Sequence, residues 1–553
     1  MFAMTLFAIF AVAVLAVGTF YEWVSCALCI MLILWLLFKL KSAKSVTFKF
    51  NLTSVACALV AICYALSAFW AVDKGMAVIG FFKFLPIPLF LLCLYFEPQT
   101  EDVIKRALPF LSAVIVIITS VLMQIPALKS YFSVAGRLAG TFEYPNTFAL
   151  LLLVAELLTF DLNTNKYLKA ALFAVLIFGI LYTGSRTVLI LAVAANLVMI
   201  ISKIKFSKKT AIISIIAFLA AVGLAVALAL AGISPFNRIL TINFGASTFV
   251  GRLLYFKDAF PIILKHPFGL GYLGYFYTQT TFQTGVYSVK FIHNDIMQLC
   301  LDIGWIPAVM LIAAVFKSLF SKGTSLQNRV ILSVMFLHIL FDFDLQFIAV
   351  FMLFIIFLKR DDGREIAIKN RDMGFNSAMA VLCAVSLYFS VALALYSFGK
   401  TKAADNMYKF NTDNKIKMLI SMNRAEGFKQ IADRIIDQNP YVYIAYAEKA
   451  RAAYKEGNFT ELIKYKNQVF EYAPLVYDEY EEYCYMLING VTLYNDAGDS
   501  KSAEICKKQL IATKEKFEDN FSKVSELGMK INDKPETKFP DDIEDYIKKL
   551  NEE

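Results

Sequence analysis

Three arginines and one histidine occur where polar loops meet strongly apolar segments of the sequence. These residues are Arg137, Arg186, Arg252 and His293. A guanidinium group binds a phosphate or diphosphate through two parallel hydrogen bonds, so the arginines suit an anionic ligand. A neutral histidine can take a proton from a hydroxyl group near physiological pH. Together they could support transfer of a group from a diphosphate, because the departing anion needs charge stabilisation.

Each of these residues also has a structural explanation. Arg137 could be an ordinary surface charge, and Arg186 could extend to a lipid headgroup at the membrane surface. A lone histidine such as His293 more often packs against neighbours or caps a helix than it performs catalysis. The chemical interpretation therefore depends on elements that would place these side chains on one face of the membrane.

The elements that carry these residues are apolar helices. Of the 553 residues, 58% are hydrophobic and 18% are charged, which excludes an ordinary soluble protein. The apolar residues fall in runs of about 17–25, enough to cross roughly 30 Å of hydrocarbon as a helix. The net charge of +9 is spread over short loops, so it indicates membrane topology and not nucleic-acid binding.

The predicted fold class is all-α: a polytopic transmembrane helix bundle of about 12–13 spans, followed by a soluble helical domain. The membrane domain covers residues 1–398 and the soluble domain covers 399–553. The predicted spans lie near 2–20, 24–40, 52–70, 77–96, 107–125, 146–161, 167–183, 187–202, 210–231, 294–316, 328–341, 345–358 and 376–397. Asp342 and Asp344 interrupt the pair at 328–358, and they could lie at an external turn or inside the bundle.

Basic loops predict the orientation of the bundle. The four loops near 39–49, 203–209, 317–329 and 359–371 are rich in lysine or arginine, and alternating spans put them on one side. The positive-inside rule makes that side cytoplasmic. The chain is therefore expected to be a multi-pass protein of the cytoplasmic (inner) membrane.

The opposite, outer side holds all four candidate residues. It comprises the loop at 126–145, the short turn around 184–186 and a large extracytoplasmic loop at 232–293. With an odd number of spans, the C-terminal domain at 399–553 is extracytoplasmic as well. Charged groups at the outer ends of spans mark either a membrane-surface contact or a water-filled functional cavity.

The C-terminal domain has the pattern of a helical repeat. Pro440 and Pro474 are separated by about 34 residues, the length of one tetratricopeptide repeat, and Gly457-Asn458 lies between them. A degenerate second copy follows around Gly498-Asp499. Such repeats build concave surfaces that bind a protein or a glycan partner. A generic helical hairpin domain is the alternative.

Taken in order, the polar segments resemble those of the O-antigen ligase and O-antigen polymerase superfamily of polytopic membrane glycosyltransferases. The matching pieces are Gly136-Arg137-Leu-Ala-Gly-Thr-Phe-Glu-Tyr-Pro-Asn146, Gly184-Ser-Arg186, Gly251-Arg252, His266-Pro-Phe-Gly-Leu-Gly271, His293-Asn294-Asp-Ile-Met-Gln298 and Asp302-Ile-Gly304. The resemblance extends over about residues 137–345, while the first five spans are similar only in hydrophobicity.

The resemblance implies an inverting, metal-independent glycosyltransferase without a cofactor. The donor would be a glycan on undecaprenyl diphosphate, with Arg186 and Arg252 binding the diphosphate and His293 activating the acceptor hydroxyl or lying beside it. Three further candidates for substrate binding are Arg137, Asn146 and Asn294. The pair Asp342-Phe-Asp344 has the spacing of a metal-binding motif, but its apolar surroundings argue against a metal.

The acceptor distinguishes a polymerase from a ligase, and both interpretations stay open. A polymerase extends another lipid-linked glycan, whereas a ligase uses a lipid core or a cell-wall polymer. The lysine-rich composition and the appended helical domain are typical of a Gram-positive cell, which has no lipopolysaccharide core. They therefore favour polymerisation or attachment of a capsule or wall polysaccharide over true O-antigen ligation. The alternatives from other classes are a polysaccharide or lipid-linked sugar transporter (flippase) and a non-catalytic membrane scaffold.

The predicted topology can be tested with protease. Protease added to intact spheroplasts should remove a tag placed at the C-terminus, because residues 399–553 are expected outside. A tag inserted in the basic loop at 359–371 should survive the same treatment, and it provides the control. Protection of the C-terminal tag would overturn the predicted orientation of this domain.

Overall fold

The computed structural model describes residues 1–43, 45–204, 247–370, 372–422 and 427–552, with some positions between 212 and 236. Many positions of the predicted span at 210–231, most of the basic loop at 203–209 and most of the start of the loop at 232–293 lie outside the described residues. The chain divides into two compact units. The first contains Met1–Leu66, Val78–Asn243 and His293–Ala394, and the second contains Ser67–Ala77, Phe244–Ile292 and Leu395–Glu553.

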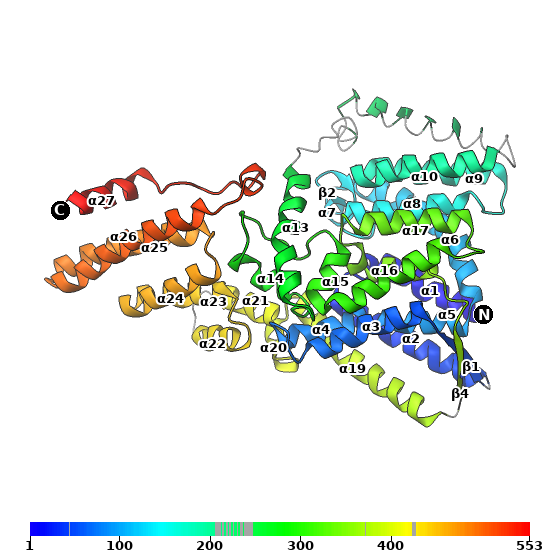
Figure 1. Ribbon diagram of the computed structural model, residues 1–553, viewed down its shortest axis with the longest axis horizontal. Coiled ribbons are helices and arrows are strands. Elements are labelled where there is room, and N and C mark those ends of the chain that lie inside the picture. Colours follow the sequence, from blue (N-terminus) through cyan, green and yellow to red (C-terminus); the bar gives the residue numbers. More distant parts are fainter. Residues whose placement is uncertain are drawn as a thin grey trace. The chain divides into compact units, whose positions relative to one another are not determined.

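The first unit is a bundle of apolar helices (Figure 1). The described helices lying wholly or mainly in it are α1 (Phe2–Leu15), α2 (Glu22–Ser42), α3 (Leu52–Ser67), α4 (Lys74–Phe84), α5 (Pro86–Phe96), α6 (Gln99–Leu122), α7 (Lys129–Phe132), α8 (Pro145–Thr159), α9 (Lys166–Thr183), α10 (Arg186–Ile204), α15 (Asp295–Ile303), α16 (Trp305–Phe320), α17 (Leu326–Ile339), α18 (Ile348–Ile356) and α19 (Met373–Ser397). All nine residues of α18 are buried, as expected for a helix that is apolar on every side and surrounded by protein.

Among the residues that the structure describes, five helical segments are long and apolar enough to cross a membrane. They are Glu22–Ser42, Lys74–Phe96, Gln99–Leu122, Lys166–Thr183 and Met373–Ser397. Other apolar helices, such as α8 and α16, are shorter. The predicted fold class, an all-α polytopic membrane protein, is therefore confirmed, while the total of about 12–13 spans stays a prediction.

Two of the predicted spans are each divided into two helices. The span expected at 294–316 breaks at Gly304, whose φ of 88° ends α15 before α16 begins. The span expected at 77–96 breaks between α4 and α5 at Pro86, which has no backbone N–H to continue the hydrogen-bond ladder. Such irregular backbone is tolerated within a membrane where protein surrounds it.

Short antiparallel strand pairs tie loops of the first unit together. Strand β1 (Ser45–Phe50) pairs with β4 (Arg364–Lys369), so that Ser45 opposes Lys369 and Phe50 opposes Arg364. Strand β2 (Ser133–Val134) pairs with β3 (Arg137–Leu138). The first pairing brings the loop before α3 against the loop before α19. Both loops therefore lie on the same side of the bundle, as the alternation of spans predicts.

The second unit combines part of the predicted outer loop with the C-terminal tail. Its helices are α13 (Ser247–Lys265), α14 (Gly274–Thr278), α20 (Thr401–Met407), α21 (Thr412–Met422), α22 (Phe428–Gln438), α23 (Tyr443–Lys455), α24 (Phe459–Tyr472), α25 (Tyr477–Asp496), α26 (Ser500–Ser522) and α27 (Asp541–Glu552). The predicted boundary at residue 398 lies close to where the tail begins, but residues 244–292 group with the tail and not with the bundle.

Two helical hairpins form the main core of the tail. Helices α23 and α24, and then α25 and α26, lie side by side (Figure 1). In both hairpins a glycine with positive φ precedes a capping residue: Asn458 accepts from Glu461 N, and Asp499 accepts from Ser502 N. Helices α25 and α26 have 20 and 23 residues, longer than α23 and α24. Tetratricopeptide repeats therefore stay a prediction for these hairpins.

A buried carboxylate joins residues 67–77 to the tail. Asp73, only 1% exposed, accepts hydrogen bonds from Thr412 Oγ1, Gln438 Nε2 and Asn439 Nδ2. It also accepts from Met76 N at the start of α4. A buried carboxylate is stable only when donors replace its lost water, so these contacts specify how the segments pack.

Replacing Asp73 should loosen this packing. We expect Asp73→Ala to lower the free energy of unfolding of the second unit by about 2–4 kcal/mol, because buried donors lose their shared acceptor. Amide hydrogen exchange should rise in peptides covering 412–439. The exposed Asp496→Ala variant in the same unit is the matched control. Unchanged exchange at 412–439 would contradict this role of Asp73.

Candidate active site

Arg137 joins two helix ends in the first unit. It lies on β3, where its Nε donates to the Thr183 carbonyl oxygen at 2.7 Å and its Nη2 donates to Asn146 Oδ1 at 2.6 Å. Thr183 is the last residue of α9, which ends at Gly184 in a left-handed conformation with φ of 60°. Asn146 lies in the first turn of α8. The guanidinium therefore fixes the end of α9 against the start of α8.

The buried carboxylate of Asp342 links Asn146 to His293. Asp342 is 1% exposed and accepts from Asn146 Nδ2 at 2.8 Å and from the Tyr144 hydroxyl at 2.8 Å. His293 Nδ1 lies 3.1 Å from Asp342 Oδ1, and the His293 side chain keeps 23% of its exposure. Arg137, Asn146, Asp342 and His293 thus form one hydrogen-bonded series.

His293 has a strained backbone conformation. Its φ is 56°, a left-handed value that is uncommon for a residue other than glycine. The Phe343 ring lies edge-on at 4.9 Å from the imidazole, and the Asp342 carboxylate meets Nδ1. Strain of this kind persists where the surroundings determine the conformation, and it is frequent at active sites.

Asn294 has a structural part in the site. Its side-chain oxygen accepts from Met297 N at 2.9 Å and caps α15. The Asn146 amide is bonded through both its oxygen and its nitrogen, so it positions Arg137 and Asp342 relative to each other. Direct substrate binding by either asparagine stays a prediction.

Two further aspartates, Asp344 and Asp295, are buried. Asp344 accepts from Thr147 Oγ1 at 2.6 Å and contacts His338 Nδ1. Asp295 accepts from Leu345 N at 2.8 Å. The sequence allowed Asp342 and Asp344 to lie either at a turn or inside the bundle. In the structure both residues lie at a turn, and both are buried. Among the described residues, no group of three or more His, Cys, Asp or Glu side chains could hold a metal ion.

The two arginines predicted to bind the donor diphosphate, Arg186 and Arg252, lie in different units. Arg186 is half-buried at the first turn of α10, only three residues beyond the Thr183 carbonyl that Arg137 binds, and it borders a small hollow with Gly184 and Leu189. Arg252 is half-buried on α13 in the second unit. The structure thus brings Arg137, Asn146 and His293 together, while a shared site for Arg186 and Arg252 stays a prediction.

Sequence reasoning missed the part that Asp342 and Tyr144 play. The sequence shows that Asp342 and Asp344 interrupt a pair of apolar spans and have the spacing of a metal-binding motif, but it does not predict the pairing of Asp342 with His293. The available signal was a carboxylate in an apolar stretch, which must be paired with donors to be buried. A second missed contact is that of the Tyr21 hydroxyl, which donates to Glu143 Oε2 at 2.8 Å, with Glu143 at a φ of 56°.

Comparison with known protein families assigns this region. The family model described as O-antigen ligase matches residues 171–312. The chain contains an O-antigen ligase domain. The match includes Arg186, Arg252, His293 and Asn294, and it confirms the predicted superfamily. Searches of curated proteins and of solved structures found no match.

The ligase domain and the apolar helices together identify an integral membrane protein. Membership of this domain family supports a role in glycan transfer during assembly of a surface polysaccharide. Arg137, Asn146 and Asp342 lie outside the matched residues. Arg137 contacts the ligase-domain residue Thr183 directly, Asp342 contacts His293, and Asn146 links Arg137 to Asp342. The hydrogen-bonded series therefore connects the ligase domain to residues on either side of it in the sequence.

Asp342→Asn should disturb this arrangement without a change of size. The amide keeps one acceptor oxygen, so the Tyr144, Asn146 and His293 contacts are not all satisfied. We expect the free energy of unfolding of the first unit to fall by about 2–4 kcal/mol. Hydrogen exchange should rise at 143–147 and at 292–296. The exposed Asp102→Asn variant is the control, and equal exchange in both proteins would contradict a central role for Asp342.

Proposed function

We propose that the chain transfers a glycan from undecaprenyl diphosphate to an acceptor at the outer face of the cytoplasmic membrane. The acceptor would be a growing or anchoring polymer, so the protein acts as a surface-polysaccharide polymerase or ligase. The observation that carries this proposal is the His293–Asp342 pair, which is joined through Asn146 to Arg137. Arg137 in turn contacts Thr183 of the ligase domain.

His293 is proposed as the general base. With Nδ1 held by Asp342, Nε2 is the ring atom that takes the proton from the acceptor hydroxyl. The hydroxyl oxygen then attacks the anomeric carbon of the donor sugar from the face opposite the diphosphate. One carbon–oxygen bond forms as another breaks, so the configuration inverts. The Asp342 carboxylate stabilises the imidazolium that results, as in other carboxylate–histidine pairs.

The arginines are proposed to stabilise the leaving group. Undecaprenyl diphosphate departs with the electron pair of the broken bond, and its anionic oxygens need positive charge nearby. Arg186 stands at the first turn of α10, where backbone N–H groups also favour an anion. Arg252 would supply a second guanidinium. Bidentate guanidinium contacts provide charge neutralisation in this scheme, so a metal ion is not part of the proposal.

Arg137 has a positioning part in this scheme. Two of its hydrogen bonds go to groups beside residues of the proposed site, namely Thr183 near Arg186 and Asn146 next to Asp342. It therefore couples the position of the donor phosphate to the orientation of His293. Its cationic group also adds to the positive potential that attracts the donor.

Complementation of a deletion strain tests the function. His293→Ala, Arg186→Ala and Arg252→Ala should each reduce polymer by roughly 100-fold or more at normal protein levels, because the base or a leaving-group contact is lost. Lipid-linked repeat units should accumulate. Surface polysaccharide and the extracted lipid-linked saccharides are the two measurements.

The control in this experiment is Arg106→Ala. Arg106 is exposed on α6, so its loss should leave polymer at the wild-type level. If all three site variants also make normal polymer, glycan transfer by these residues is wrong. A transporter would instead leave repeat units on the cytoplasmic face, which protected labelling of the lipid-linked saccharide would detect.

A further inference from the structure

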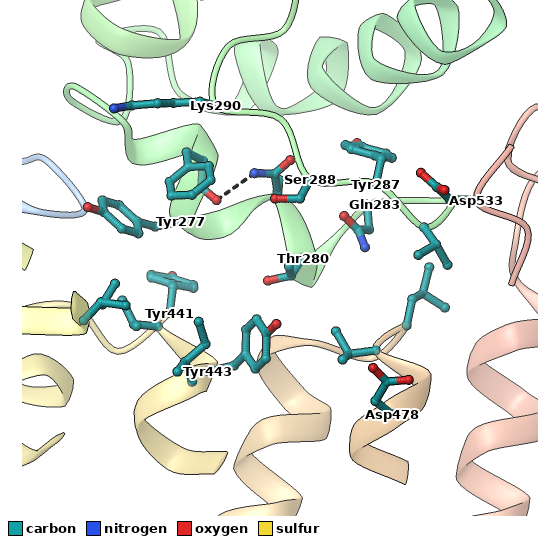
Figure 2. Close-up of a pocket in the computed structure, with 18 of the residues that line it drawn as sticks. Tyr277, Thr280, Gln283, Tyr287, Ser288, Lys290, Tyr441, Tyr443, Asp478 and Asp533 are labelled. Atoms are coloured by element: carbon teal, nitrogen blue, oxygen red, sulfur yellow. Dashed lines mark hydrogen bonds between the residues drawn. The ribbon is translucent and has the colours of Figure 1, made fainter. Parts of the chain in front are cut away.

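The second unit contains a cavity of about 1030 Å³ that the transfer chemistry does not use. Figure 2 shows its two main walls, one from the segment that carries Tyr277, Thr280 and Gln283 and the other from the tail around Tyr441 and Tyr443. The first wall lies within the residues matched by the O-antigen ligase family. The cavity therefore lies between a part of the ligase domain and the helical tail.

Specific contacts fix the two walls against each other. The Tyr277 hydroxyl donates to Asp413 Oδ1 at 2.6 Å, and Thr280 Oγ1 donates to the Tyr472 carbonyl oxygen at 2.7 Å. At the far end, Ser525 N donates to the Thr284 carbonyl oxygen at 2.8 Å. Because these bonds connect the walls on more than one side, they hold the cavity in a defined shape.

Tyrosine is the main side chain in the lining. The six tyrosines are Tyr277, Tyr287, Tyr396, Tyr441, Tyr443 and Tyr477. A tyrosine offers an apolar ring face and a hydroxyl group, which matches a sugar ring with its C–H faces and hydroxyl edge. Burial raises the pKa of Tyr443, and burial beside acidic groups raises that of Tyr277, so both keep their protons at physiological pH.

The charge of the lining argues against an anionic ligand. Among the described residues that line the cavity, four are acidic, three are lysines and none is an arginine. A diphosphate or a polyanionic polymer would be repelled by the acidic groups or left without bidentate partners. The cavity therefore suits a neutral or zwitterionic chain, unlike the arginine-containing site of the transfer reaction.

One buried amide points to a ligand with hydroxyl donors. Gln283 is 8% exposed, and within the part of the chain that the structure describes no group hydrogen-bonds its Oε1. Figure 2 shows this amide directed into the cavity. Neighbouring Gln279 differs, because its amide donates to two carbonyl oxygens and accepts from Val289 N. A buried acceptor is costly to leave unpaired, so a ligand hydroxyl would regain that bond.

From this geometry we infer that the cavity binds a short stretch of neutral or zwitterionic polysaccharide. Its volume is at the upper end of the roughly 300–1,000 Å³ of small-ligand pockets, so it accommodates several sugars. Tyrosine rings stack on the sugar faces, and Gln283 accepts from a hydroxyl. That these sugars belong to the polymer on which the enzyme acts rests on the proposed function. Bound there, the polymer stays attached between transfer cycles.

Binding by the purified full-length protein tests this inference. The probe is a set of lipid-free oligosaccharides released from the strain's own surface polysaccharide, measured by calorimetry. We expect binding to wild type and equally to His293→Ala, about tenfold weaker binding to Gln283→Leu and to Tyr441→Ala, and no change for Tyr485→Ala. Tyr485 is a tyrosine of the same tail that is 42% exposed and does not line the cavity.

Thermal unfolding separates binding from folding. Gln283→Leu replaces a buried amide whose Oε1 has no hydrogen-bond partner among the described residues with an apolar group of similar size, so its stability should equal or exceed that of wild type. Weaker sugar binding by an equally stable protein would therefore support a ligand contact. Undiminished binding by both Gln283→Leu and Tyr441→Ala, or binding of unstructured peptides in place of the oligosaccharides, would overturn the inference.

Polymer length in cells distinguishes failure of this inference from failure of the proposed function. Gln283→Leu should still make polymer but with shorter chains, whereas His293→Ala should make none. Normal chain length with Gln283→Leu would overturn the cavity's part in retaining polymer and leave transfer intact. Fragments with and without the phosphate of the lipid-linked end identify the source: equal affinity indicates interior sugars, and a need for the phosphate would contradict the binding of a neutral stretch.

Discussion

The buried carboxylate of Asp342 is the constraint on which the candidate active site depends. A carboxylate with almost no exposure must replace its hydration with protein donors, and failure to do so costs several kilocalories per mole. Its donors come from the start of α8 and from the loop before α15. Satisfying this one group therefore brings distant segments together and orients His293. Arg137 extends the same series to the end of α9.

Irregular backbone around this series is what exposes the functional groups. Gly184 ends α9, Gly304 separates α15 from α16, and His293 itself has a left-handed φ. A continuous helix would bury its N–H groups in its own ladder, whereas a break leaves polar groups for a ligand. Strain at His293 is then maintained by packing with Phe343 and by the contact with Asp342.

The two units differ in the kind of ligand that they suit. The first carries guanidinium groups and a carboxylate–histidine pair, which suit an anionic leaving group and a proton transfer. The second carries a tyrosine-lined cavity with nearly balanced charge, which suits uncharged sugars. Asp73, with its donors on α21 and at the end of α22, keeps the tail packed on the segment before α4. One wall of the cavity is part of the ligase domain, so the tail and that domain share a single binding surface.

Local pattern determined much of this protein without the structure. Apolar runs indicated the membrane helices, Gly-Asn and Gly-Asp pairs marked the hairpins of the tail, and loop polarity selected Arg137, Arg186, Arg252 and His293. These signals are readable because helix length, capping and membrane cost depend on neighbours in the sequence. Only the tertiary structure decided that Asp342 pairs with His293, that two predicted spans break, and that residues 276–290 form a cavity with the tail. The partners of a buried charge are chosen by long-range packing, and no periodicity along the chain encodes them.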